Sequence, residues 1–582
     1  MNHHSIVRVC RLAVIGAILL FSASCVNVNE KLGESFIPTD QKWDVFPQEP
    51  APLTQIRLQM ADSLSGYSST RFTFGAVNDD ILGTTVKGAS FTLVPLVDTL
   101  DLGENVRVRG FHFTAVRDTL STVYSNELRI IQNVYVSELK APLDSTVLYS
   151  GTFMNAEARE KYLDLSKRIT DGVPVYDGGD SLSFDFSREY TESFVERLQK
   201  ADHDSLALYL QDIPGIYITT DTPVGPGGRI NMFEIGVKYD SQYYITGNYA
   251  ELKITADYDD RKDVDTSFVF IFGPGDFLKN LESSSELAQY AFNTSEHETV
   301  TDYTDGGVVA GAELYVEGGS GVKPVIKAKE IREIIEEQMT AAGIQDISEA
   351  VINKATVILP YNVGTDYEAL DKFPMILSPT LRLKSSDGSY VTYAGLTDSS
   401  IETENQGDIN RSLAMYSPDI SHHVQEIMKL KKDENYEKNI DKYDIWMLIM
   451  YEEVYTEDSS SSYMDDYYQN LMYSSYYNNM MYDPYGYGYG YGGYGGYGGY
   501  GGYGGYGGYG GYGGYGYNNY YNYLMMAQYA SAYNSGSDAE YSIELDKDRY
   551  YRCTLNGPGY SDDINELPRL KVTFSVPKTA EK

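Results

Sequence analysis

The stretch Val106-Arg-Val-Arg-Gly-Phe-His-Phe113 alternates apolar and polar side chains. Successive side chains of a β-strand point to opposite faces, so this period of two predicts a half-buried strand. The alternation recurs at residues 56–60, 91–94 and 130–136, and further strand-like runs occur at residues 183–186, 207–210, 216–218, 230–239, 252–258 and 268–272. Many strands with few long helices predict a mainly β protein containing two β-sandwich or jelly-roll-like domains.

Two segments have the spacing of short amphipathic helices. Residues 189–200 place Phe194, Val195 and Leu198 on one face, and residues 329–342 do the same with Ile331 and Ile335. A weak internal repeat accompanies them. Residues 184–210 and 416–450 both read as a strand edge, a short helix, a charged stretch and a strand, which indicates either a domain duplication or a chance similarity.

The N-terminus has the layout of a secretory signal. Arg8 and Arg11 precede the apolar run at residues 12–21, and the small residues 22–24 lead to Cys25. This arrangement resembles the lipobox of bacterial lipoproteins, which implies cleavage before Cys25 and lipidation on it. Ser22 departs from that pattern, which has leucine at this position, so an ordinary signal peptide is the alternative. The run of 10 apolar residues is too short for a transmembrane helix, which needs about 20.

Composition limits the partners and the means of stabilisation. The formal charge of −37 argues against nucleic acid, whose phosphates are bound by clusters of Lys and Arg. Once Cys10 leaves with the signal and Cys25 is lipidated, only Cys553 is left, so no intramolecular disulfide is expected. A sizeable hydrophobic core must therefore hold the fold.

These features predict a domain order. We expect a signal peptide at residues 1–24, a lipidated cysteine and proline-bearing tether at 25–52, and a first β-rich domain at 53–275. A polar linker at 276–307 and a second β-rich domain at 308–582 complete the chain. The second domain contains a low-complexity insertion at 459–537.

The insertion is centred on strict Tyr-Gly-Gly triplets. Its glycine content predicts a disordered loop between two strands of the second domain. Either the loop is an adhesive arm or it is a repeat expansion that the fold tolerates. The tyrosines that would make the arm adhesive are Tyr491, Tyr494, Tyr497, Tyr500, Tyr503, Tyr506, Tyr509, Tyr512 and Tyr515.

Metal binding has weak support in the sequence. Five acids, Asp257, Asp259, Asp260, Asp263 and Asp265, cluster between two predicted strands. An EF-hand starting at Asp257 would need Gly and Glu where Lys262 and Phe268 stand, so a solvated acidic hairpin loop is the default interpretation. The adjacent His422 and His423 diverge by about 100° on a helix and do not chelate together easily. We predict no metal and no cofactor.

No enzyme motif stands out. The turn Gly318-Gly-Ser-Gly321 lacks the Gly-x-Ser-x-Gly spacing of a nucleophile elbow, and Gly225-Pro-Gly-Gly228 lacks the residues of a phosphate loop. No catalytic residue is predicted. The leading hypothesis is a non-enzymatic protein that binds glycan or protein or structures the cell surface. The alternative is a polysaccharide hydrolase with two facing carboxylates.

Several short sequence segments, taken in order, resemble those of one lipoprotein family. They are Leu32-Gly-Glu-Ser-Phe-Ile-Pro38, Asp62-Ser-Leu64, Phe74-Gly-Ala-Val-Asn-Asp-Asp-Ile-Leu-Gly83, Leu314-Tyr-Val-Glu-Gly-Gly-Ser-Gly-Val322, Ile352-Asn-Lys-Ala355 and Pro568-Arg-Leu-Lys-Val-Thr-Phe574. The chain is similar in this order to the Bacteroidota family known as domain of unknown function 4270. That resemblance implies an envelope lipoprotein but no activity, because none is established for the family. The paired strand patterns also resemble the β-sandwich modules of exported carbohydrate-associated proteins, an analogy of fold alone.

The residues after Cys25 bear on localisation. Val26-Asn-Val-Asn29 precede the first acid, Glu30, and do not form the usual signal for inner-membrane retention. We therefore expect lipid anchoring in the outer membrane, facing either the periplasm or the outside.

Overall fold

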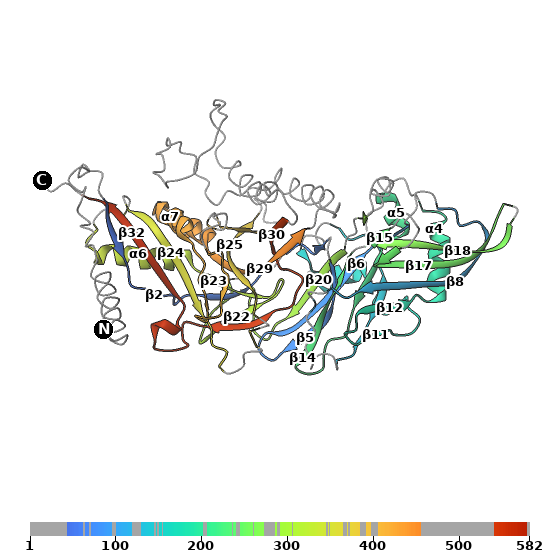
Figure 1. Ribbon diagram of the computed structural model, residues 1–582, viewed down its shortest axis with the longest axis horizontal. Coiled ribbons are helices and arrows are strands. Elements are labelled where there is room, and N and C mark those ends of the chain that lie inside the picture. Colours follow the sequence, from blue (N-terminus) through green and yellow to red (C-terminus); the bar gives the residue numbers. More distant parts are fainter. Residues whose placement is uncertain are drawn as a thin grey trace, which may run out of the picture.

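The computed structural model describes residues 43–578, apart from residues 456–539 and shorter gaps, the longest of which are 122–129, 273–285, 385–390 and 399–404. The fold is mainly β, with several antiparallel sheets and few helices, as predicted. Two hydrophobic cores lie along the long axis of an elongated body (Figure 1). We call the part around the first core the first domain and the part around the second core the second domain.

Two main sheets enclose the first core. One contains β4 (Tyr67–Ser68), β5 (Arg71–Asp79), β6 (Gly83–Phe91), β10 (Tyr135–Glu138), β13 (Ile216–Thr219), β14 (Gly227–Glu234) and β20 (Ala291–Glu298). The other has the order β12 (Ser181–Asp185), β8 (Glu104–Val116), β17 (Tyr249–Tyr258), β18 (Arg261–Phe272), β7 (Leu93–Pro95). Small ribbons pair β9 (Gln132–Asn133) with β11 (Val175–Tyr176), and β15 (Val237–Tyr239) with β16 (Ile245–Gly247) and β19 (Glu286–Leu287).

Aromatic rings from both sheets meet in this core. The ring centroids of Phe91 and Phe272 are 4.4 Å apart, and those of Phe113 and Phe272 are 5.3 Å apart. Helix α4 (Arg188–Leu198) closes one side, with Phe194 and Leu198 buried one turn apart. Its first turn is capped by the Ser187 side chain, which accepts a hydrogen bond from the backbone N–H of Tyr190. The alternation that predicted β8 and the spacing that predicted this helix are thus both confirmed.

The second core lies between two more sheets. One has β1 (Trp43–Pro47), β32 (Arg569–Pro577), β24 (Val351–Pro360), β28 (Met415–Tyr416) and β27 (Ile409–Asn410) in that order, and β2 (Ala51–Pro52) also pairs with β32. The other has the order β21 (Val308–Val309), β3 (Arg57–Met60), β23 (Val322–Ile326), β29 (Ile445–Tyr455), β25 (Ile376–Lys384), β26 (Val391–Gly395), and β30 (Glu540–Leu545) pairs with β29. A ribbon of β22 (Glu313–Glu317) and β31 (Arg552–Asn556) completes the set.

Helices cover part of the second core. They are α6 (Ala328–Ala341), α7 (Ser421–Lys429) and α8 (Tyr436–Ile440). Ile331, Ile335 and Met339 of α6 are fully buried and lie about one turn apart, as the sequence predicted. The short helices α3 (Ala156–Tyr162) and α5 (Leu206–Asp212) belong to the first domain. Among the described residues, no helix is both long and apolar enough to cross a bilayer.

The domain limits differ from those that the sequence suggested. Leu53, Ile56 and Leu58, expected in the first domain, are buried in the second core. The last part of the expected tether, β1, pairs with the C-terminal strand β32. Within the expected linker, β20 is a strand of the first domain and pairs with β6 and β4. A sequence pattern indicates which side chains are buried but not in which of the two cores. The domain limits predicted from the sequence were therefore wrong.

One predicted strand is a helix. Residues 207–210 lie within α5, and Tyr209 of this helix and Ile213 directly after it are buried one helical turn apart. The run Leu-Ala-Leu-Tyr-Leu contains good helix formers, and its apparent alternation is too short to separate the two periods. The suggested internal repeat fails at this element, because its counterpart in the second domain, β29, is a strand.

Candidate functional site

Buried and partly buried polar side chains fill the boundary between the two domains. We call this set the interdomain junction. From the first domain it contains Ser68, Arg71, Thr85, Lys87, Asp118, Asn293 and His297; from the second domain it contains Glu317, Ser320, Lys323, Tyr451, Asp546, Asp548 and Arg549. Such groups are costly to bury unless they are paired, so their contacts indicate what the junction does.

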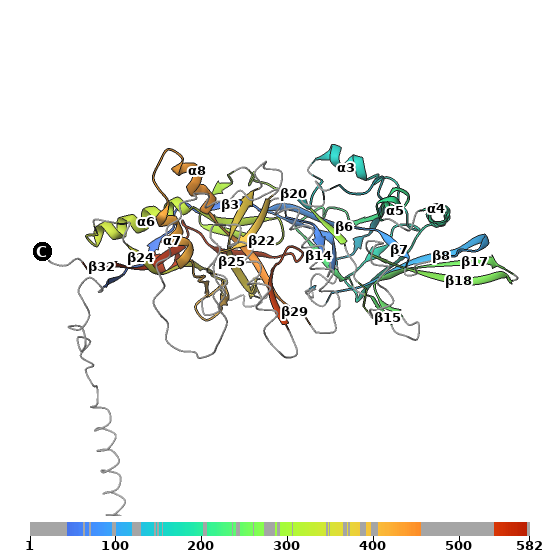
Figure 2. The same ribbon diagram turned by 90° about the horizontal axis from the view of Figure 1, so that it is seen from above.

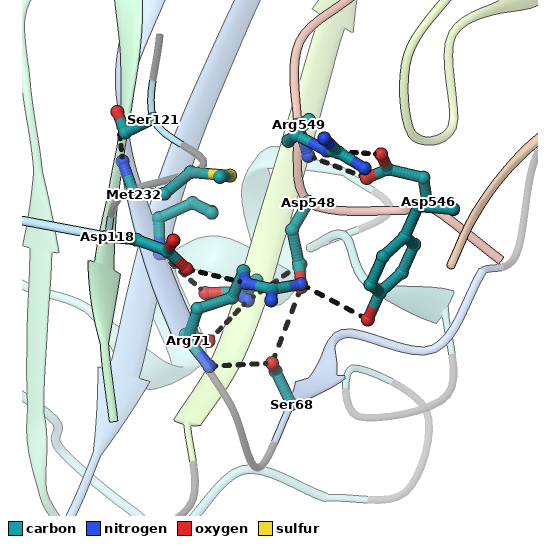
Figure 3. Close-up of polar contacts among 11 residues, drawn as sticks. Ser68, Arg71, Asp118, Ser121, Met232, Asp546, Asp548 and Arg549 are labelled. Carbon is teal, nitrogen blue, oxygen red and sulfur yellow. Dashed lines mark hydrogen bonds and ion pairs between the residues drawn. The ribbon is translucent and has the colours of Figure 1, made fainter. Parts of the chain in front are cut away.

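Arg71 contacts an acid of its own domain and a tyrosine of the other domain. Its Nε donates to Asp118 Oδ2 at 2.9 Å, and the two side chains are 5% and 6% exposed. Its Nη1 donates to the hydroxyl of Tyr451 at 3.2 Å, and its guanidinium lies 5.2 Å from the centroid of that ring. Figure 3 shows Arg71 extending towards the segment that carries Asp546, Asp548 and Arg549. A cation of the first domain is therefore neutralised within its own domain and bound by the second.

The segment after β30 is held by the first domain. Lys87 Nζ donates to the backbone oxygens of Lys547 and Asp548 at 2.9 and 2.7 Å. Asn293 Nδ2 donates to Asp548 Oδ1 at 2.9 Å, and Ser68 Oγ donates to the other carboxylate oxygen at 3.4 Å. Lys87 is 2% exposed, and its burial lowers the pKa of the ammonium group. These bonds span the boundary and couple the two domains mechanically.

A chain of hydrogen bonds runs through His297. Its Nε2 lies 2.9 Å from Ser320 Oγ and 3.0 Å from Ser295 Oγ, and its Nδ1 lies 3.1 Å from Thr85 Oγ1. Thr85 donates its hydroxyl hydrogen to Glu317 Oε1 at 2.7 Å, so its oxygen is free to accept from the imidazole. Nδ1 then carries the hydrogen and Nε2 accepts from the serines. In order, the Ser320 hydroxyl, the His297 imidazole, the Thr85 hydroxyl and the Glu317 carboxylate form a hydrogen-bonded relay.

Burial keeps this imidazole neutral. The side chains of His297 and Glu317 are 6% and 3% exposed. Desolvation lowers the pKa of His297, the Glu317 carboxylate 4.0 Å away opposes that shift, and the ammonium groups of Lys323 and Lys87 add to it. Ser320 is only partly buried. The relay thus runs from a buried acid to a hydroxyl near the surface, with a neutral base between them.

Lys323 is a second buried lysine of the junction. Its Nζ donates to the backbone oxygens of Gly319 and Gly321 at 2.8 and 3.1 Å, and also to that of Glu317. Burial lowers the pKa of Lys323 to about 7, although the nearby Glu317 carboxylate partly opposes the shift. The ammonium group stabilises the turn between β22 and β23 by satisfying three inward-facing carbonyls.

Close packing explains the glycine-rich turn. A Cβ on Gly318 would lie 2.3 Å from the backbone oxygen of Arg549, and one on Gly321 would lie 2.3 Å from a Glu317 carboxylate oxygen. Gly319 has a φ of 58°, in the left-handed region that favours glycine. The phrase that superficially suggested a nucleophile elbow therefore forms a tight turn against the segment after β30, and it also positions Ser320 beside His297.

An open hollow of about 730 Å³ lies beside α3 in the first domain. It is lined by Lys140, Asn155, Ala156, Arg159, Glu160, Leu163, Asp164, Leu165 and Glu296, and none of these described residues is aromatic. Glu296 accepts hydrogen bonds from Thr152 and Phe153 at 3.0 Å and lies 3.6 Å from Arg159. Its oxygens are thus committed to partners within the protein. The hollow differs from the aromatic-lined groove that a carboxylate hydrolase of polysaccharide would need.

The aspartates singled out in the sequence lie at the β17–β18 hairpin. Asp257 accepts from Asn105 Nδ2 at 2.9 Å and from the backbone N–H of Asp263 at 2.9 Å, while Asp263 pairs with Arg107. Asp265 accepts from Thr255 at 2.6 Å. Asp259 occupies the turn with a φ of 47°, and Asp260 lies outside the described residues. Among the residues that the structure describes, no group of three or more His, Cys, Asp or Glu side chains converges as a metal site would.

Other sequence candidates are placed as follows. The backbone N–H groups of His422 and His423 donate to Asp398, and His423 Nε2 lies 2.9 Å from the backbone oxygen of Tyr443. Cys25 and the tyrosines at residues 491–515 lie outside the described residues. The strands on either side of the insertion are hairpin partners, since Tyr455 of β29 pairs with Glu540 of β30. Residues 456–539 therefore connect two neighbouring strands, as predicted.

The interdomain junction could not be predicted from the sequence. Thr85 and His297 are 212 positions apart, and Lys87 and Asp548 are 461 positions apart. The one local signal was the Gly318–Gly321 turn, whose spacing matched no catalytic motif.

Comparison with known proteins adds no relative: no family model, no curated protein and no solved structure matches the chain. The resemblance to the Bacteroidota lipoprotein family therefore stays a prediction.

Proposed function

We propose that this protein is an outer-membrane lipoprotein that holds a binding surface for glycan or protein away from the membrane. The observation that carries the proposal is the arrangement along the long axis. Strand β1, the first described element after Cys25, lies at one end of the body, and the strands β8, β17 and β18 project at the opposite end (Figures 1 and 2). A lipid on Cys25 would then anchor the end opposite to this projection.

The interdomain junction supports a role as a spacer. Lys87, Arg71 and Asn293 of the first domain bind groups of the second domain. Inter-domain motion is the default for domains joined by a small polar contact. Here buried, charge-assisted bonds fix the second domain against the first, so the projecting strands keep a set distance and direction from the anchored end.

The projecting strands carry a preorganised polar face. We call residues 104–109 of β8, 253–258 of β17 and 261–267 of β18 the distal finger. Arg109 Nε donates to Thr255 Oγ1 at 2.7 Å, and Arg107 pairs with Asp263, with side chains that are 59% and 70% exposed. Cross-strand bonds of this kind hold exposed donors and acceptors in fixed positions, which favours recognition of a polar ligand such as a glycan or a protein surface.

Removing the exposed pair of the finger tests the proposal. We expect the double variant Arg107→Ala/Asp263→Ala to bind at least about tenfold more weakly to any glycan or envelope protein that the wild type retains, because two fixed polar contacts are worth about 1–2 kcal/mol. Binding is measured on a glycan array and by titration with purified hits. The matched control is Arg188→Ala/Glu192→Ala, which removes an exposed ion pair on α4. Equal affinities for wild type and finger variant would contradict a binding role for the finger.

The tyrosine–glycine insertion is a second proposed contact. Replacing residues 459–537 with Asn-Gly closes the β29–β30 hairpin, and replacing Tyr491 to Tyr515 of the triplets with serine keeps the length but removes the rings. If the tyrosines are adhesive, both changes weaken binding in the same assays. If only a tolerated expansion is present, neither does.

A second candidate function rests on the His297 relay. The Ser320 hydroxyl beside a neutral imidazole is the pair seen in activated serines, and here the Thr85 hydroxyl links that imidazole to the Glu317 carboxylate. In that role Ser320 Oγ attacks the carbonyl carbon of an ester while its proton passes to His297 Nε2, and the leaving alcohol takes that proton. Water then releases the acyl group from Ser320 with the same base. The carboxylate-based polysaccharide hydrolase that the sequence suggested stays a prediction.

A fluorophosphonate probe decides this second candidate. If Ser320 is activated, mass spectrometry finds the adduct on its side chain, and both Ser320→Ala and His297→Gln abolish it. Ser295→Ala is the matched control, because Ser295 shares the same imidazole nitrogen, and this variant keeps the label. Absence of any adduct on wild-type Ser320 would assign the relay to the structure of the junction alone.

A further inference from the structure

The outer face of β1 exposes apolar side chains at the anchored end. Trp43 and Val45 of β1 are 47% and 58% exposed, and Val351 of β24 is 42% exposed. Val45 and Val351 both pair with Ser575 of β32, so the three positions form one row across the sheet. Trp43 lies two residues along β1 from Val45 and therefore on the same face. We call Trp43, Val45 and Val351 the anchor-end face.

The opposite face of β1 packs against the second core. Phe46 stacks on Phe574, with ring centroids 5.7 Å apart, and contributes to the second core. The chain has two tryptophans, and the other, Trp446, is 4% exposed. The exposure of Trp43 is thus a property of its position on the outer face and not of a poorly packed strand.

The position of this face in the chain identifies its occupant. Seventeen residues separate Cys25 from Trp43. A chain of that length reaches at most about 60 Å. A lipid on Cys25 therefore keeps the anchor-end face close to the bilayer surface at high effective concentration, so even a weak affinity becomes significant.

We propose that the anchor-end face docks onto the lipid surface and fixes the orientation of the anchored body. This inference rests on the proposed lipid anchor. The indole of tryptophan prefers the region of the lipid headgroups, and valine side chains gain from leaving water at the same depth. The exposed Lys571 lies on β32 and can meet headgroup phosphates, whereas Lys578, 46% exposed, pairs with Asp44 at 3.7 Å. The overall charge of −37 keeps the rest of the chain in solution.

Docking of the anchor-end face sets the orientation of the body relative to the membrane, which the tether alone does not set. A body held by a lipid and a seventeen-residue segment alone would tumble about its anchor. With β1 against the bilayer, that end of the body is held at the membrane, and the distal finger lies at the opposite end of the long axis (Figure 2). The anchor then supplies attachment, and the anchor-end face supplies direction.

Tryptophan fluorescence tests the docking. The lipidated full-length protein is reconstituted into phosphatidylcholine vesicles with or without brominated acyl chains, which quench indoles at the bilayer. We expect about twofold quenching of Trp43 emission, because an interfacial indole lies next to the acyl chains. The variant Trp446→Phe leaves Trp43 as the sole emitter. The wild type serves as a second measurement, because Trp446 is buried and out of reach of the quencher.

A pair of matched variants locates the contact. Val45→Ser/Val351→Ser keeps the reporter but removes the apolar neighbours, and we expect it to lose most of the quenching. Val173→Ser/Val175→Ser changes two similarly exposed valines of the first domain, 50% and 58% exposed, and should leave quenching unchanged.

Flotation with the vesicles separates the two proposals. Protein that floats but shows no quenching overturns the docking and leaves the anchor standing. Protein that does not float, and behaves like Cys25→Ala, overturns the anchor itself. A blue shift of Trp43 that grows with protein concentration in the absence of lipid would assign the face to a second copy of the chain and would also overturn the inference.

Discussion

Replacing Arg71 with methionine lowers the free energy of unfolding by about 3–5 kcal/mol, because it leaves the Asp118 carboxylate buried without its guanidinium partner. The Arg71 and Asp118 side chains are 5% and 6% exposed, so solvent cannot take over the role of the lost cation. The change also removes the contacts to Tyr451 across the boundary. Denaturant unfolding, followed by tryptophan fluorescence and circular dichroism, measures the loss.

The shape of the transition carries further information. In the wild type the junction couples the domains, and we expect one cooperative transition. In the Arg71 variant we expect the domains to unfold separately, since the remaining boundary contacts are fewer. The matched control is Arg188→Met, which breaks an ion pair whose side chains are 82% and 52% exposed. Exposed pairs of this kind contribute about 0.3–0.5 kcal/mol. A loss of similar size in both variants would contradict the assignment of Arg71 as a junction residue.

The second large effect concerns pH and Lys323. Burial lowers the pKa of Lys323 to about 7 in the folded protein, against 10.5 for an unperturbed lysine. Between these values the unfolded chain binds more protons than the folded chain, so the free energy of unfolding rises with pH. The slope reaches about 1.4 kcal/mol per pH unit for one such group, which gives about 2–3 kcal/mol between pH 7 and pH 9. Lys323→Met removes this contribution.

The free energies of unfolding of the wild type and the variants are compared at each pH. Burial also lowers the pKa of Lys87, so the Lys323 variant keeps part of the slope. Above pH 9 the unfolded Cys553 ionises, whereas burial raises its folded pKa to about 12, and this linkage lowers stability with pH. The difference between wild type and Lys323→Met cancels that term. Lys429→Met, on an exposed lysine, should run parallel to the wild type. If the curves of Lys323→Met and the wild type run parallel, the lowered pKa of Lys323 is contradicted.

Local patterns in the sequence were enough to predict many of the strands and helices. The alternation at residues 106–113 became β8, and the one-turn spacing of Ile331 and Ile335 became α6. These patterns succeed because the period of buried side chains follows directly from backbone geometry. They failed at residues 207–210, where a short apolar run fits both periods and burial of Tyr209 and Ile213 selected the helix.

The assignment of segments to domains needed the tertiary structure. Nothing local to Leu53 or Ile56 says that they pack against strands from the end of the chain. The same holds for β20, a sheet strand in the middle of a stretch that is otherwise polar. Pairing over hundreds of residues is chosen by the fit of whole sheets and not by any single segment.

By itself, the sequence determined the mainly β class, two of the helices and the connection of residues 456–539 to neighbouring strands. Each of these follows from local periodicity and turn chemistry. Only the tertiary structure decided that Arg71, Lys87 and His297 meet the second domain, and that Trp43 and Val351 share one face. Buried charges and exposed apolar rows are exceptions to the local rule of polar outside and apolar inside. Their cost or gain depends on partners that folding brings from distant parts of the chain.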